Sequence, residues 1–72
     1  MSLEDALRNS IEQQLQYCDP ETTPKLCELL TVEENRDNIK DDVVHYVKKD
    51  GLSIAQAIVQ VERDYNPNLM ND

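Results

Sequence analysis

Apolar residues recur at helical spacing in the first part of this 72-residue chain. The repeating apolar positions are Leu3, Leu7, Ile11, Leu15 and Cys18. A repeat of three to four residues places these side chains on one helical face, so it predicts an amphipathic helix over residues 3–17 that buries this stripe. Ser2 is suited to cap the helix, because its hydroxyl can accept a hydrogen bond from an N–H group of the first turn.

A turn signal then predicts a second, short helix. Thr23 can cap a helix whose first position is Pro24, where the missing N–H group of proline costs nothing. We therefore expect a short helix over residues 24–30.

The third predicted helix spans residues 32–49. Thr31 and Glu34 have the spacing of a capping box, in which each side chain bonds to a free N–H group of the first turn. One sector of the helix is apolar and contains Ile39, Val43, Tyr46 and Val47. Gly51 is suited to the left-handed conformation that ends a helix, so the helix should stop just before it.

The fourth predicted helix, residues 54–65, has the clearest boundaries. Ser53 and Gln56 repeat the capping-box spacing, and Leu52 can pack back on the first turn. Asn66 precedes a proline and is therefore pushed out of helical geometry. The main apolar stripe consists of Ile54, Ala57, Ile58, Val61 and Tyr65.

No segment alternates apolar and polar residues as a strand would. We therefore predict an all-α fold, a small bundle of three main helices plus one short helix. Residues 1–66 should form a single helical domain, and residues 67–72 a flexible C-terminal tail. The last two helices, with Gly51 between them, should form an αα-hairpin that resembles a helix-turn-helix.

Composition narrows the possible partners. Fifteen acidic residues against seven lysines and arginines give a net charge of -8, which repels nucleic acid and anionic lipid. No apolar run approaches the roughly 18 residues needed to span a bilayer, and the N-terminus is not of the signal-peptide type. We therefore expect a cytoplasmic protein without a membrane or nucleic-acid partner. Since the chain has no Phe or Trp, its core must be small, and such domains often oligomerise.

A helix-turn-helix that binds nucleic acid is the alternative interpretation of the hairpin. Gln56, Gln60 and Arg63 fall on one predicted solvent face of the last helix, and these residue types can read base edges in the major groove. Phosphate contacts supply most non-specific affinity, however, and only Lys48 and Lys49 form a basic cluster. The charge therefore favours a purely structural hairpin.

The helix over residues 32–49 carries a strongly acidic face. Glu34, Asp37 and Asp41 share one side of it. Such a face is most often a solvated surface that keeps a protein soluble. The functional alternative is a docking surface for a basic partner, whose binding would weaken steeply with added salt.

Catalytic and metal chemistry have little support. His45 is the only histidine, and it falls on the opposite side of its helix from Val43. Cys18 and Cys27 are expected to be free, largely buried thiols, because the chain shows no export signal. With one glycine a phosphate-binding loop is not possible either. We expect no enzymatic activity, no metal and no cofactor.

The last helix has an unusually wide apolar surface. Ala55 and Val59 lie about 100 to 140° round from Ile54, outside the main stripe, whereas a surface helix normally shows a single stripe. Either other helices pack against both sides, or this second flank, with Ala55, Val59 and Glu62, is an interface for a partner or a second copy. We therefore expect a small acidic interaction protein, acting as an adaptor, regulator or inhibitor and forming either a homodimer or a complex with another protein.

Overall fold

The computed structural model describes residues 2–66, which form four helices and no strand. The helices are α1 (Leu3–Gln16), α2 (Pro24–Leu29), α3 (Glu33–Asp50) and α4 (Ile54–Tyr65). The all-α prediction is confirmed, and each helix lies within one or two residues of its expected position. The expected tail, residues 67–72, lies outside the described residues.

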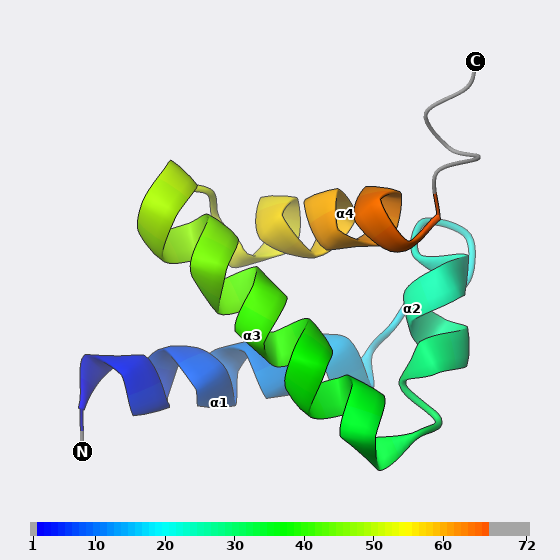
Figure 1. The fold of residues 1–72 in the computed structure, drawn as a ribbon, viewed down its shortest axis with the longest axis horizontal. Helices are drawn as coiled ribbons and strands as arrows, with labels where there is room; N and C mark the ends of the chain where they lie inside the picture. Colours follow the sequence, from blue (N-terminus) through cyan, green and yellow to red (C-terminus); the bar gives the residue numbers. More distant parts are fainter. Residues whose placement is uncertain (1, 67–72) are drawn as a thin grey trace.

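The long helix α3 organises the bundle. It begins beside the short α2, crosses in front of α1 and ends next to the start of α4 (Figure 1). Helix α4 contacts α1, α2 and α3, whereas α1 and α2 do not contact each other. Helix α2 therefore packs against α3 and α4 and not against α1.

The core is made of aliphatic side chains from all four helices. Its buried members are Ile11, Leu15, Leu26, Ile39, Val43, Val44, Ala57 and Val61. Burying a valine, leucine or isoleucine completely stabilises a fold by roughly 1.5–3 kcal/mol, so these few residues supply most of the driving force. The stripe predicted for α1 is wrong at its start, because Leu3 is 91% exposed on a first turn that extends beyond the start of α4 (Figure 1).

The hairpin between α3 and α4 has the expected local structure. Gly51 adopts a left-handed conformation with φ of 69° and ends α3. The capping box is complete, because the Gln56 N–H donates to Ser53 Oγ and the Ser53 N–H donates to Gln56 Oε1, each at 3.2 Å. Ser2 caps α1 as predicted, by accepting a hydrogen bond from the Asp5 N–H.

Two predicted caps are wrong, because both threonine hydroxyls donate to carbonyl groups. Thr31 donates to the carbonyl oxygen of Glu28 at 2.8 Å and so closes the end of α2, while α3 begins after Val32 without a side-chain cap. Thr23 is buried and donates to the carbonyl oxygen of Asp19 at 2.9 Å. The free N–H groups in the first turn of α2 therefore need an acceptor other than Thr23.

Candidate functional site

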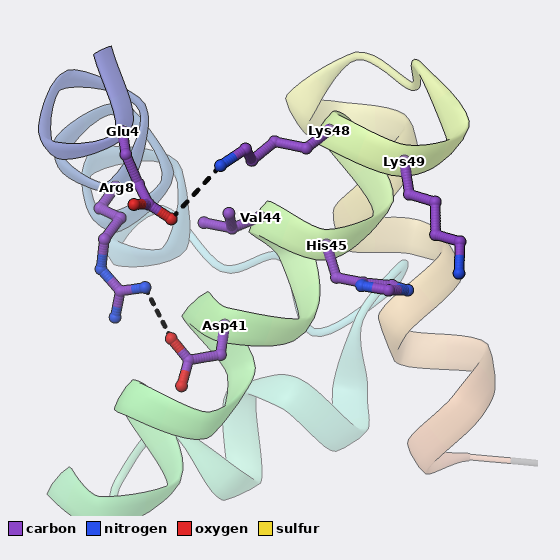
Figure 2. A pocket seen from close by; sticks show the side chains of 7 residues that line it. All are labelled: Glu4, Arg8, Asp41, Val44, His45, Lys48 and Lys49. Carbon is purple, nitrogen blue, oxygen red and sulfur yellow. Dashed lines mark hydrogen bonds and ion pairs between the residues drawn. The ribbon is translucent and has the colours of Figure 1, made fainter. Parts of the chain in front are cut away.

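A charged groove of about 480 Å³ separates α1 from α3. Figure 2 shows Glu4 and Arg8 on α1 facing Asp41 and Lys48 on α3, with Val44 between the two helices. Arg8 Nη1 lies 2.6 Å from Asp41 Oδ1, and Lys48 Nζ lies 3.6 Å from Glu4 Oε1. The hydrogen bond to Asp41 raises the pKa of Arg8 above its ordinary value. These opposite charges neutralise each other across the groove, so they join the two helices and leave little net charge for a ligand.

The predicted acidic face is partly used by internal contacts. Asp41 forms an ion pair with Arg8, and Asp37 Oδ1 lies 3.7 Å from Lys40 Nζ in the next turn. Glu34 is exposed and has no ion pair within the described chain. Arg8 of α1 forms an ion pair with Asp41 and neutralises its charge. The face is therefore less negative than the sequence of α3 alone indicates.

An apolar surface lies on the opposite flank of α4 from the residues buried in the core. Val59 is 41% exposed and lines three adjoining hollows of about 390, 180 and 300 Å³. Ala55 shares two of these hollows, and Tyr17, which is 84% exposed, lines one of them from the end of α1. We call the three hollows, with Ala55, Val59 and Tyr17, the Val59 surface. It brings together two exposed apolar side chains that lie 42 positions apart in the sequence.

The residues considered for base recognition lie on the rim of the same surface. Gln56, Gln60 and Arg63 line the largest of the three hollows together with Val59. The side-chain oxygen of Gln56 is already bonded to the Ser53 N–H in the capping box. The basic residues Lys48 and Lys49 line the groove between α1 and α3 and none of these three hollows, so they and the three residues considered for base recognition line different depressions.

Glu62 differs from the exposed residues of α4, because its side chain is used inside the fold. It is completely buried, and its carboxylate accepts hydrogen bonds from the Leu26 N–H at 2.8 Å and the Lys25 N–H at 3.1 Å. Asn66 Nδ2 also donates to it, at 3.3 Å. The first N–H groups of a helix lack partners within that helix and carry partial positive charge, so a carboxylate satisfies them well. Helix α2 is thus capped by a residue of α4. Glu62 also lines the third hollow beside Val59, but its carboxylate is used by hydrogen bonds within the fold.

The expectation of free thiols is wrong. Cys18 and Cys27 form a disulfide, with their Cα atoms 5.7 Å apart. The two residues approach because the chain turns back directly after α1, through a turn in which the Asp19 carbonyl accepts hydrogen bonds from the N–H and hydroxyl groups of Thr23. Periodicity placed both cysteines near apolar faces, but it carried no information on their separation in space.

Two tyrosine–aspartate hydrogen bonds join α3 to α4 reciprocally. The Tyr65 hydroxyl on α4 donates to Asp42 on α3 at 2.7 Å, and the Tyr46 hydroxyl on α3 donates to Asp64 on α4. The hydrogen bond to Asp42, together with burial, raises the pKa of Tyr65 to about 12. The pKa of Tyr46 is raised in the same way, mainly by its bond to Asp64.

The Tyr65 contact should make stability depend on alkaline pH. Because the folded pKa is above the unfolded value of 10.0, the contact contributes fully below pH 10 and is lost as the pH rises towards 12. We expect the free energy of unfolding of the wild type to converge on that of Tyr65→Phe over this range, measured by urea denaturation at successive pH values. A difference between the two proteins that stays constant from pH 8 to 12 would contradict this assignment.

Metal binding and membrane insertion find no support in the described part of the chain. Residues 2–66 contain no group of three or more His, Cys, Asp or Glu side chains placed to hold a metal ion. His45 is exposed, and its neighbour Asp41 is occupied by Arg8. None of the helices in this region is both long and apolar enough to cross a bilayer.

Two features of the candidate site were not predicted from the sequence: the exposed ring of Tyr17 and the Cys18–Cys27 disulfide. Tyr17 lies outside the apolar stripe of α1, and this position could have indicated an exposed aromatic residue. The chain matches no family model, and no curated protein or solved structure matches it, so its function must be inferred from this geometry.

Proposed function

We propose that this chain is a small non-enzymatic protein-interaction module, an adaptor, regulator or inhibitor, that binds a partner protein through the Val59 surface. The observation that carries the proposal is the position of Val59, which is 41% exposed at the junction of three hollows. Tyr17 adds an exposed aromatic ring beside one of them. Aliphatic and aromatic side chains beside open hollows are typical of the central contacts of protein interfaces.

The shape of the surface favours a protein over a small molecule. Small-molecule sites usually enclose most of the ligand surface, whereas these hollows are open depressions spread along one helix and the neighbouring loop. A protein segment can place one side chain in each hollow and still contact the exposed residues between them. The apolar flank of α4 thus has the form expected of an interface.

The charge of the chain favours a basic partner over a second copy. Two copies would each bring a net charge of -8 to the contact, and like charges across an interface oppose association. Asp19 lies at the edge of the Val59 surface and can face a lysine or arginine of the partner. We therefore propose a different protein that inserts aliphatic side chains and places a basic residue opposite Asp19.

A photo-crosslinking experiment tests this proposal. A benzoylphenylalanine at position 63, on the rim of the surface, should give an adduct with a partner in extracts of the native host. Val59→Glu should lower the adduct yield about tenfold, because a carboxylate would have to be buried against the apolar contact. The yield is measured by mass spectrometry of the purified adducts.

Val32 supplies the matched control. It is 50% exposed, so Val32→Glu introduces the same charge at another exposed valine that lines none of the three hollows. This variant should leave the adduct unchanged. Equal yields from both variants would overturn the docking site, and an adduct of twice the mass of the 8.3 kDa chain would show that the occupant is a second copy.

A further inference from the structure

The Cys18–Cys27 disulfide supports one wall of the Val59 surface. The hollow between α4 and the loop after α1 is lined on one side by Ala55 and Val59 and on the other by Tyr17, Cys18 and the start of the loop. Cys18 therefore lies in the wall that faces α4. Since α1 and α2 do not contact each other, the disulfide is a cross-link that joins the end of α1 to α2 directly.

The disulfide is also accessible from its other side. Cys18 and Cys27 together line a second hollow, of about 450 Å³, between the end of α1 and α2. Both residues are partly exposed. A thiolate must reach one of the sulfur atoms to open a disulfide, and this hollow provides the approach.

We propose that the Cys18–Cys27 disulfide is a redox switch that holds the Val59 surface in its binding-competent shape. This inference rests on the proposed function, because it concerns control of that same surface. When the disulfide is intact, Tyr17 and the loop are fixed opposite Val59. When it is reduced, the loop keeps its backbone and its internal hydrogen bonds but loses the cross-link to α2, so the wall moves and affinity for the partner falls.

The chemical step is a thiol–disulfide exchange with a dithiol. The dithiol is oxidised to its own disulfide, the Cys18–Cys27 bond breaks, and each cysteine sulfur takes up one proton and the equivalent of one electron. The product is two thiols, and the reverse reaction restores the bond. An oxidising environment therefore maintains the docking surface, and a reducing one opens it.

The rest of the fold does not depend on the disulfide alone. Leu26 is fully buried, and the carboxylate of Glu62 still accepts hydrogen bonds from the first turn of α2 after reduction. Helix α2 thus keeps two anchors to the bundle, whereas the wall that contains Tyr17 loses its cross-link to α2. This difference makes a change in the docking surface possible without unfolding of the whole protein.

The structural part of the proposal is tested on the isolated chain by methyl NMR. Addition of dithiothreitol should shift the Val59 methyl signals by several linewidths and leave those of Val44, which packs in the groove between α1 and α3, in place. The double variant Cys18→Ser with Cys27→Ser should give the spectrum of the reduced wild type, and dithiothreitol should not change it. Unchanged Val59 signals in the reduced wild type would overturn the switch, and so would equal shifts at Val44, which would indicate general loosening.

The binding part uses the crosslinker at position 63. Reduction should lower the adduct yield of the otherwise native chain about tenfold, and the double serine variant should give the low yield with or without dithiothreitol. The serine variant could instead give a high adduct yield without dithiothreitol and a low yield with it. This result would show that the redox-sensitive bond lies in the partner, and it would overturn the proposal. Insensitivity of the adduct to Val59→Glu would refute the proposed function itself, while the methyl shifts would still report on the switch.

Discussion

Replacing Glu62 by alanine is expected to lower the free energy of unfolding by about 3 kcal/mol, because the N–H groups of Lys25 and Leu26 would lose a charged acceptor inside the protein. The side chain is also completely buried, so its removal leaves a cavity in addition to the unpaired donors. For a domain of this size such a loss is comparable to the total stability. Urea denaturation followed by circular dichroism at neutral pH measures the change.

Two further substitutions separate the capping role from a general effect of charge. Glu62→Gln retains one carbonyl acceptor in nearly the same volume, so we expect a loss of about 1–2 kcal/mol. Glu28→Ala removes a carboxylate that is 73% exposed and only 3.8 Å from Lys25, and it should cost less than about 0.5 kcal/mol. If Glu62→Ala were no more harmful than Glu28→Ala, the carboxylate would not be the cap of α2.

Removing the disulfide should have the second largest effect on stability. Cys18 and Cys27 are separated by nine positions, and closing a loop of this length restricts the unfolded chain enough to stabilise the fold by about 2.5–3 kcal/mol. A loss of this size lowers the melting temperature of a small domain by roughly 10–20 °C. We therefore expect the wild type with dithiothreitol, and the double serine variant, to melt well below the oxidised protein.

The reagent itself is controlled for by the serine variant. Its melting temperature should be the same with and without dithiothreitol, since it has no other cysteines. Identical melting of the oxidised and reduced wild type would mean that the loop is equally restricted without the bond. Reduction must also leave the protein folded at 25 °C for the switch proposed above to act through the Val59 surface, and the same melting curves report this.

Local sequence was enough to predict the helices and the ends of most of them. The capping box at Ser53 and the left-handed Gly51 depend on contacts within a few residues, so the sequence carries all the information that these features need. The same holds for the apolar sector of α3, which buries Ile39 and Val43 as the helical period predicts. The fold class follows from these local patterns.

The caps of α2 and α3 show where local reasoning fails. Thr23 and Thr31 have suitable spacing, but each hydroxyl donates to a nearby carbonyl group instead. A short polar side chain has several backbone partners within reach, and the choice among them depends on how the chain turns. The acceptor for α2 is Glu62, 36 residues from Leu26, which no local pattern could indicate.

The candidate site was predictable only where it depends on the local periodicity of α4. The helical wheel of α4 placed Ala55 and Val59 on a second apolar flank, and both are exposed. It placed Glu62 on that flank as well, but α2 packs over this end of α4 and buries the residue. Whether a position on the flank is covered depends on a neighbouring helix, and so on the tertiary arrangement.

The sequence by itself determined that the chain is helical, acidic and built around a small aliphatic core, because these properties follow from local periodicity and composition. Only the tertiary structure decided that Glu62 caps α2, that Cys18 bonds to Cys27, and that Tyr17 lies beside Val59. Each of these contacts joins side chains through space, and distances through space are set by the packing of the helices.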